Sequence, residues 1–415
     1  MRYLLATALS ACLGSAAWSQ EVPQPANSLP ATPLDPPIPA VEPSATPPSN
    51  VDDAALLQEI QASLKSPDTA AAGAPGAARP LTSLGPSNVY NPAMSVNGLF
   101  LGAVTSNRHP AEGDVDTGLT AQEIELQVMA NVDPYFAANI ILSLPSGESL
   151  GIEEAFVTPS EQPLGIQARI GKIKLPFGRE NPTHTHALPF VDKSLIGTAV
   201  FGEEGLGEVG AELSYLFPTP WYALLSAAVV NADNPIEFAS PRQGSLGGVA
   251  NLKNVFDLWD DATLEAGLSF ATGDNANNRL ANVGGAHLVF KWRPAREAST
   301  RELVIAAEAM YAQRPNGVVP PPGTRDTSIG GAYGYVQWRL AQRWYTAGRF
   351  DYLGYPNESQ GINRRGSLIL VFVPTEFSAI RLQADAVRPP HQTRLIYEGF
   401  VQLNFTLGAH PAHAY

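Results

Sequence analysis

The sequence predicts an all-β protein: a transmembrane antiparallel up-and-down β-barrel of about 16 strands that occupies residues 93–407. Through this region apolar and polar residues alternate over short segments, which places one face of each strand on lipid and the other on the lumen. The connections between the segments are alternately short and long, as in outer-membrane barrels. Outside the start of the chain there is no run of 18 apolar residues, so a membrane-spanning helix is not expected.

The first residues have the composition of a secretory signal peptide. An apolar run leads to small residues with a suitable cleavage point after Ser19, so residues 1–19 are expected to be removed on export. The one cysteine, Cys12, lies in this segment and leaves the mature chain without a thiol for disulfides or catalysis. Cys12 also ends a short lipoprotein-like cleavage box, which is the alternative interpretation.

Three segments separate the signal peptide from the barrel. Residues 20–50 are rich in Pro, Ala, Ser and Thr and are expected to form a disordered periplasmic linker. Residues 51–66 carry an apolar stripe at helical spacing, which predicts a short amphipathic helix, either an oligomerising coiled coil or a transient helix. Residues 67–92 are predicted to be a second flexible linker, and residues 408–415 a tail beyond the last strand.

The strand pattern can be followed residue by residue near both ends of the barrel. From Glu123 to Ala130 the even-numbered residues are apolar, so they are expected to face lipid while Glu123 and Glu125 face the lumen. In the last strand Phe405 and Gln402 fall on opposite faces. Phe405 also resembles the terminal signal by which the barrel-assembly machinery would receive the chain for insertion.

The predicted connections fall into a short set and a long set at opposite ends of the barrel. The short ones are rich in Pro and Asp and comprise 132–134, 159–163, 218–220, 256–261, 293–301, 341–343 and 374–376. The long ones are 106–119, 176–207, 231–246, 272–282, 314–328 and 354–365. An even number of strands places both termini in the periplasm and the long connections outside the cell.

Charged residues recur on the predicted inner faces. The dry core of a soluble β-sandwich, the main alternative fold, would bury these charges, whereas a barrel lumen keeps them in water. The predicted pore-wall residues are Glu123, Glu125, Arg169, Arg339, Arg349, Arg381 and Asp385. Aromatic residues near strand ends suit the headgroup level of a bilayer: Tyr135, Trp221, Trp292, Trp338, Trp344 and Tyr345.

The connection 176–207 is the longest, and it carries charges of both signs. If it lies at the narrowest section of the pore, its charges set selectivity, because confinement strengthens the effect of each group. The predicted constriction residues are Lys172, Lys174, Arg179, Glu203 and Glu204. The alternative is that they are ordinary solvated charges at the rim.

In strand count and loop order the chain resembles sixteen-stranded outer-membrane porins of Gram-negative bacteria. The resemblance implies that the third long loop folds inward, that the barrel is a homotrimer, and that it contacts membrane lipid and lipopolysaccharide. The Lys174-Leu175-Pro176-Phe177-Gly178 turn, together with the short helix before the barrel, is similar to the phosphate-selective porin O and P family. Four glutamates oppose the basic residues of this loop, and the formal net charge is −13, so phosphate selectivity is not implied.

Two histidines of the same loop, His184 and His186, are spaced as possible metal ligands. Residues two apart in an extended segment project to the same side, so both rings could reach one Zn²⁺, with His109 or Glu203 completing the shell. The alternative is that both rings pack against or hydrogen-bond the neighbouring backbone.

These features predict a porin-like channel for passive or weakly selective diffusion of small hydrophilic solutes or ions. The alternative is an outer-membrane receptor or channel for a specific ligand such as a metal (zinc) or phosphate. Enzymatic activity is not expected, because Ser194, the nearest candidate nucleophile, has no evident base, and no cofactor is expected. The 26 basic residues are outnumbered by 39 acidic ones, so nucleic-acid binding is not expected either.

Overall fold

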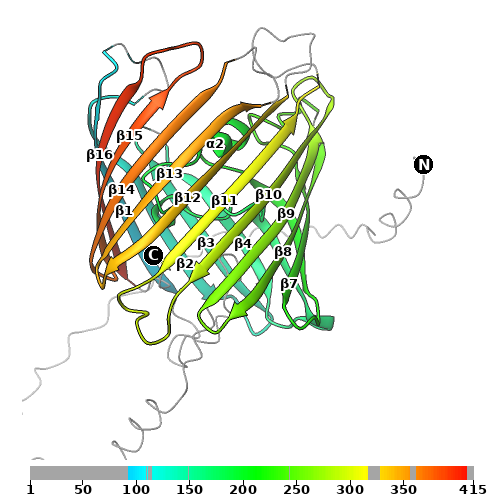
Figure 1. Ribbon diagram of the computed structural model, residues 1–415. Coiled ribbons are helices and arrows are strands. Elements are labelled where there is room, and N and C mark those ends of the chain that lie inside the picture. Colours follow the sequence, from blue (N-terminus) through cyan, green and yellow to red (C-terminus); the bar gives the residue numbers. More distant parts are fainter. Residues whose placement is uncertain are drawn as a thin grey trace, which may run out of the picture. The chain divides into compact units, whose positions relative to one another are not determined.

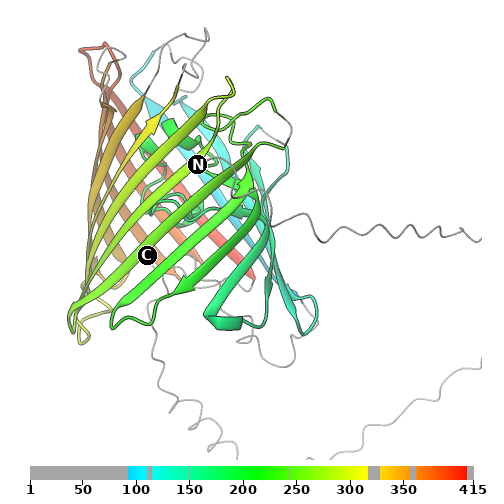
Figure 2. The same ribbon diagram turned by 90° about the vertical axis from the view of Figure 1, so that its right-hand side faces the viewer.

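The computed structural model describes residues 92–108, 110, 115–147, 149–242, 244–315, 328–355 and 361–408. Sixteen antiparallel strands in this part of the chain close into one barrel (Figures 1 and 2). Each strand pairs with its neighbours in sequence, and β1 pairs with β16. The predicted all-β barrel of 16 strands is therefore confirmed. The expected signal peptide, linkers, helix and tail lie outside the described residues, apart from Pro92 and Gly408.

The strands are 9 to 14 residues long, which is enough for a tilted strand to cross a bilayer. Their bounds are β1 Ala93–Thr105, β2 Gly118–Asn131, β3 Phe136–Pro145, β4 Gly151–Pro159, β5 Ile166–Lys174, β6 Gly207–Leu216, β7 Tyr222–Asn231, β8 Leu246–Trp259, β9 Ala262–Asp274, β10 Leu280–Trp292, β11 Leu303–Gln313, β12 Ile329–Ala341, β13 Trp344–Tyr355, β14 Asn363–Thr375, β15 Ser378–Arg388 and β16 Ile396–Gly408. Three short helices complete the described elements: η3 Pro163–Gly165, η4 Thr185–Ala187 and α2 Leu195–Phe201. Among the described residues no helix is both long and apolar enough to cross a membrane.

The alternation expected from the sequence is present on the two faces of the barrel wall. In β16, Val401 is 55% exposed on the outer face, whereas Gln402 beside it is fully buried on the inner face. In β2, Ile124 is exposed, and Glu123 and Glu125 are buried toward the lumen. The outer face is thus apolar wherever this pattern holds, as a lipid-facing surface requires.

The predicted short connections are present at one end of the barrel, and most of the long ones at the other (Figure 1). The predicted long connection 272–282 is wrong. The chain between β9 and β10 has only residues 275–279, because residues 272–274 continue the ladder by pairing with residues 280–282. Strand pairing therefore takes up more of the 272–282 segment than its turn-rich composition suggested.

Most of the predicted interfacial aromatics lie near the end that carries the short connections. Trp221 and Trp344 are exposed on the outer face, and Trp292 stacks on Trp338 with ring centroids 6.0 Å apart. Tyr345 is an exception, because it follows Trp344 and therefore faces inward, where the Arg339 guanidinium lies 5.0 Å from its ring centroid. Its expected place at the headgroup level is wrong.

Candidate functional site

The segment between β5 and β6, residues 175–206, turns into the barrel and is called here the inserted loop (Figures 1 and 2). It contains η4 and α2, and it hydrogen-bonds inward-facing side chains of strands from β2 to β16. Its bounds agree with the predicted connection 176–207 to within one residue. The inserted loop thus fills part of the lumen.

One asparagine ties the two ends of the inserted loop together. The Asn181 side chain donates hydrogen bonds to the carbonyl oxygens of Leu175, at 2.8 Å, and Leu206, at 3.1 Å. Its Oδ1 accepts a hydrogen bond from the Leu206 amide at 2.6 Å. The loop therefore leaves and rejoins the wall at a base that is closed by these hydrogen bonds.

Ser194 caps the short helix α2 inside the lumen. Its hydroxyl oxygen accepts a hydrogen bond from the Gly197 amide at 3.1 Å and donates one to Oε2 of Glu180 at 2.5 Å. The side chain is fully buried. These contacts give Ser194 a structural role as the cap at the N-terminus of the helix.

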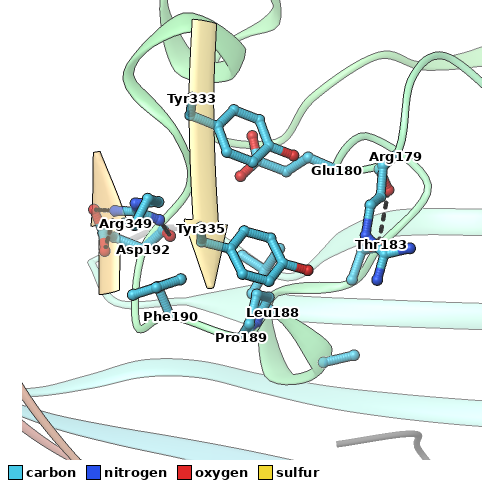
Figure 3. Close-up of a pocket in the computed structure, with 11 residues that line it drawn as sticks. Arg179, Glu180, Thr183, Leu188, Pro189, Phe190, Asp192, Tyr333, Tyr335 and Arg349 are labelled. Carbon is cyan, nitrogen blue, oxygen red and sulfur yellow. Dashed lines mark hydrogen bonds and ion pairs between the residues drawn. The ribbon is translucent and has the colours of Figure 1, made fainter. Parts of the chain in front are cut away.

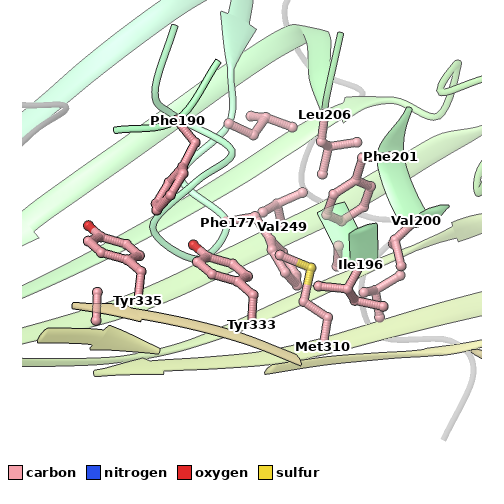
Figure 4. Close-up of a cluster of buried hydrophobic side chains, with 14 of the residues drawn as sticks. Phe177, Phe190, Ile196, Val200, Phe201, Leu206, Val249, Met310, Tyr333 and Tyr335 are labelled. Atoms are coloured by element: carbon pink, nitrogen blue, oxygen red, sulfur yellow. The ribbon is translucent and has the colours of Figure 1, made fainter. Parts of the chain in front are cut away.

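The helix α2 and the start of the inserted loop pack on an apolar patch of the inner wall (Figure 4). Phe177 and Phe201 meet edge to face, with ring centroids 5.0 Å apart. The wall residues of this cluster on β7 to β11 include Val230, Val249, Ala271, Ala281, Val283, Met310 and Ala312. The sequence alternation predicted a polar inner face all round the barrel. The structure differs, because one sector of the inner face is apolar and is covered by the inserted loop.

A second attachment is a set of partly buried ion pairs and hydrogen bonds, called here the arginine clamp: Asp192, Asp351, Arg349, Arg365 and Gln383. Asp192 of the inserted loop pairs with Arg349 at 3.0 Å and with Arg365. Gln383 donates to Asp192 Oδ1 at 2.8 Å, and Asp351 holds Arg349 at 2.9 Å. Burial alone would raise the pKa of Asp192, but Arg349 and Arg365 lower it below its ordinary value.

The two histidines reach the inner faces of β2 and β4 and form the His–Glu cluster: His184, His186, Glu125, Glu153 and Glu154. Nδ1 of His184 lies 3.2 Å from Glu153 Oε1 and 3.5 Å from Glu125 Oε2, and its Nε2 lies 3.4 Å from Glu154 Oε2. Nδ1 of His186 lies 3.1 Å from Glu125 Oε2. The two rings stack with their centroids 5.8 Å apart.

An irregularity in β4 brings two consecutive carboxylates into this cluster. Ile141 of β3 pairs with Glu154, but the next residue, Leu142, pairs with Ile152, so Glu153 is an extra residue in the ladder. A β-bulge of this kind breaks the alternation of faces. Both Glu153 and Glu154 are consequently buried on the lumen side.

The charge of the cluster is strongly negative before its histidines are considered. Burial and the positive charge of Lys174 oppose protonation of His184, but Glu153 and Glu154 outweigh them and raise its pKa to about 10. In the absence of another cation, the imidazolium of His184 therefore supplies positive charge between the carboxylates at neutral pH.

The structure separates the two lysines that were predicted to line a constriction. Lys172 pairs in the ladder with the outward-facing Val209, and its amine donates to the carbonyl oxygen of Ile152 at 2.5 Å. Lys174 is buried, and its amine lies 2.5 Å from Glu153 Oε1. Lys174 thus belongs beside the His–Glu cluster, and Lys172 does not join it.

The other three predicted constriction residues lie at different places on the inserted loop. Arg179 enters the lumen, where the phenol of Tyr335 and the carboxylate of Glu265 act on its guanidinium. Glu203 and Glu204 are exposed, and the carbonyl oxygen of Glu203 accepts a hydrogen bond from the buried Lys193 amine. Of the five, only Lys174 and Arg179 face inner-wall side chains in this arrangement.

Arg179 also borders a small cavity between the inserted loop and strands β12 and β13 (Figure 3). Its volume is about 50 Å³, which is room for a few water molecules only. The cavity is lined by Arg179, Glu180, Thr183, Ala187, Leu188, Pro189, Phe190, Asp192, Tyr333, Tyr335 and Arg349. It is therefore a gap beside the loop and too small for an organic substrate.

The seven predicted pore-wall charges all occur on inner strand faces, but they have different partners. Three of them hold the inserted loop: Glu125 through the histidines, Arg349 through Asp192, and Arg381 through the carbonyl oxygen of His186 at 3.0 Å. The remaining four contact strands or turns. Glu123 is hydrogen-bonded by Ser143 and also by Thr185 of the inserted loop. Arg169 pairs with Glu212, Arg339 donates to turn carbonyl oxygens, and Asp385 is hydrogen-bonded by Gln383.

Several residues of the arginine clamp and of the His–Glu cluster were not predicted as site residues. Arg365 and Gln383 sit on strands whose alternation gives no hint of a loop partner. Glu153 and Glu154 had a usable signal, because two adjacent carboxylates in a predicted strand cannot both face lipid and both suit a bulge. His109, which was considered as a metal ligand, lies outside the described residues, and Glu203 is not part of the His–Glu cluster.

No protein-family model matches the chain. An uncharacterised protein of Aquifex aeolicus is 29% identical over 337 residues, which covers 72% of this chain and 70% of that protein. The phosphate-selective porin O and P family is thus not confirmed by these comparisons.

Solved outer-membrane proteins share the barrel at low sequence identity. An anion-selective porin of Comamonas acidovorans superimposes with a TM-score of 0.53 at 10% identity, covering 76% of this chain and all of that one. OprB of Pseudomonas putida gives 0.50 at 8% identity, over 77% and 95% of the two chains. OmpT of Vibrio cholerae gives 0.50 at 6% identity, over 76% and 97%. The described part of the chain therefore has the fold of a sixteen-stranded porin-like barrel.

Proposed function

We propose that this protein is an outer-membrane channel for passive or weakly selective diffusion of small hydrophilic solutes or ions, narrowed by the inserted loop. The observation that carries the proposal is the barrel wall, which is apolar outside and lined by charged and amide side chains inside. A polar lumen in a membrane barrel is a path for water and solutes. The inserted loop supports a narrowing, because it contacts Glu125 of β2 and Glu308 of β11, which lie seven strands apart around the barrel wall.

The proposal includes the surroundings of the barrel. The protein lies in the bacterial outer membrane, contacts lipid and lipopolysaccharide with its apolar outer face, and keeps its N-terminal linker in the periplasm. It assembles as a homotrimer. Light scattering in detergent, corrected for the bound detergent, is expected to give three times the mass of one chain, and a monomer mass would contradict the trimer.

Purified protein in planar bilayers tests the channel directly. We expect discrete conductance steps that scale with salt concentration. The absence of steps from protein that migrates as a folded barrel on unheated gels would contradict the channel and favour the alternative, an outer-membrane receptor for a specific ligand.

Arg179 is the predicted constriction residue with the clearest place in the lumen, where it faces Glu265 and also acts on Lys253 of β8. Removing its charge in Arg179→Gln is expected to lower the anion-to-cation permeability ratio about twofold, because charges in a confined path act strongly on passing ions. The measurement is the reversal potential in a salt gradient. Arg242→Gln is the matched control, because Arg242 is an exposed loop residue whose side chain is 66% accessible. Equal ratios for wild type and Arg179→Gln would remove Arg179 from the constriction.

A further inference from the structure

The His–Glu cluster contains a group of side chains with the donor atoms of a metal site. One ligand atom from each of Glu125, Glu153 and His184 lies within 4.8 Å of the other two. Imidazole nitrogen together with carboxylate oxygen is a donor set that suits zinc and similar divalent cations. Three protein ligands would leave a fourth position for water or solute, as in open zinc sites.

An oxygen atom in this group has no partner. Oε1 of Glu153 is engaged by the Lys174 amine at 2.5 Å, but Oε2 accepts no hydrogen bond from any described residue. The Glu153 side chain is only 6% exposed. Burying a carboxylate oxygen without a hydrogen-bond donor costs desolvation free energy. A cation bound at this oxygen would offset that cost.

The charge balance points the same way. Four carboxylates, those of Glu123, Glu125, Glu153 and Glu154, are buried together, and one lysine, Lys174, is buried among them. Lys174 neutralises one charge, so the carboxylates keep an excess of negative charge in a poorly hydrated place. A divalent cation among these carboxylates would supply the missing positive charge.

The carboxylate of Glu154 is placed to orient the His184 ring as a metal ligand. If one ring nitrogen meets the cation, the other is free to meet a carboxylate, and Glu154 Oε2 lies 3.4 Å from Nε2. Carboxylates in this outer position fix the ring and raise its affinity for metal. His186 stacks on His184 and lies 3.1 Å from Glu125, so it can hold the Glu125 carboxylate in place.

We propose that Glu125, Glu153 and His184 bind one divalent transition-metal cation, of the class of Zn²⁺, inside the barrel. The cation would join the inserted loop, through His184, to the wall strands β2 and β4, through the two glutamates. The site does not depend on the channel activity proposed above, because it requires only the barrel and the docked loop.

Titration calorimetry with zinc chloride on the full-length, chelator-treated protein in detergent tests the site. We expect one Zn²⁺ per chain for the wild type, and at least tenfold weaker binding for Glu153→Gln and for His184→Gln. Mg²⁺ is expected to bind more weakly than Zn²⁺, because it prefers a shell of oxygen ligands and water. Unheated gel mobility shows whether each variant keeps its barrel.

Two controls separate this site from other histidines. His287→Gln removes a fully buried histidine that lies 3.1 Å from Glu265 in the same barrel but outside the three-residue group, and it is expected to bind Zn²⁺ like the wild type. A variant with both tail histidines, His410 and His413, replaced by Ala is expected to do the same. No binding by the wild type, or wild-type affinity in both Glu153→Gln and His184→Gln, would overturn the site. Loss of binding in the tail variant alone would assign the metal to the tail and also overturn it. Because the readout is calorimetric, failure of the site leaves the conductance test unaffected.

Discussion

Asp192 is the residue through which the arginine clamp acts on the inserted loop. It carries the negative charge that Arg349 and Arg365 share, and it lies 3.0 Å from the Arg349 guanidinium. Breaking a buried ion pair from one side leaves the remaining charges poorly compensated. Asp351 stays beside both arginines and limits the damage.

Because the Asp192 side chain is partly exposed, Asp192→Asn is expected to weaken docking of the loop by about 2 kcal/mol, which is roughly a thirtyfold loss of amide protection in the loop. Hydrogen–deuterium exchange of the segment around Val191 measures it. Glu297→Gln is the matched control, because Glu297 forms an exposed pair with Arg301 in a short turn, and such pairs contribute little. Unchanged protection in Asp192→Asn would show that the clamp does not hold the loop.

The pH dependence of the same contact follows from the lowered pKa of Asp192. A carboxyl group whose pKa is lowered by folding stabilises the folded state above its ordinary pKa, which is 3.8 for Asp, and that stabilisation is lost as the pH falls through the lowered value. We expect the difference in loop protection between wild type and Asp192→Asn to be constant from pH 7 to about pH 5 and to shrink below about pH 4. Exchange rates corrected for their intrinsic pH dependence give this difference. A difference that disappears already at pH 6 would contradict the assigned ion pairs.

Sequence alternation was a good guide for single wall residues and a poor one for their partners. It placed Glu125, Arg349 and Arg381 on the inner face correctly. It could not show that these three contact the inserted loop, because a period of two gives a direction and no distance. Tyr345 was predicted at the headgroup level because it is an aromatic residue near a strand end. That prediction is wrong, because the adjacent Trp344 is on the outer face and Tyr345 therefore faces inward.

At the scale of elements, docking of the inserted loop depends on the apolar patch of the inner wall beneath α2, called here the apolar seat. The helix has only seven residues, so it is not stable alone and needs the wall beneath it. Phe201 is buried against Phe177 in this seat.

Phe201→Ala is expected to cost about 3–4 kcal/mol of docking free energy, through lost burial and the cavity left behind. The measurement is the exchange protection of residues 195–201. The control is Phe377→Ala, because Phe377 is exposed in the turn between β14 and β15. Protection that falls equally in both variants would mean that α2 is not held by this seat.

The path of the loop could not be predicted for physical reasons. A segment of this length has no periodicity, and its contacts come from strands far apart in the sequence. The apolar seat was hidden as well, because strands such as β11 carry apolar residues on both faces, Ile305 outside and Met310 inside. The bulge at Glu153 was visible only as a break in the pattern.

At the scale of the whole molecule, the number of strands and the closure of the barrel could be predicted, because they rest on repeated local signals. Each strand contributes its own alternation, and most short turns contribute a Pro or an Asp, so an error in the prediction of one element does not affect the others. The register between β1 and β16, from Ser95 opposite Gly408 to Thr105 opposite Glu398, then closes the sheet without a free edge. Function at this scale depends on how much of the lumen the inserted loop leaves open.

Deletion of the loop interior tests that dependence, and the base of the loop makes the variant practicable. Asn181 joins Leu175 and Leu206, so we expect that replacing residues 183–204 by two glycines leaves the strands paired. Unheated gel mobility confirms the barrel. If the deletion does not fold, the triple variant of Asp192→Asn, Phe201→Ala and His184→Gln weakens the same loop at the arginine clamp, the apolar seat and the His–Glu cluster.

The decisive measurement is the single-channel conductance of the wild type and of the loop-released variant in planar bilayers at the same salt concentration. A channel narrowed by residues 175–206 gives small wild-type steps and severalfold larger steps once the loop is removed or released. Equal conductance in the two proteins, or no steps from either folded barrel, would contradict a solute channel narrowed by this loop.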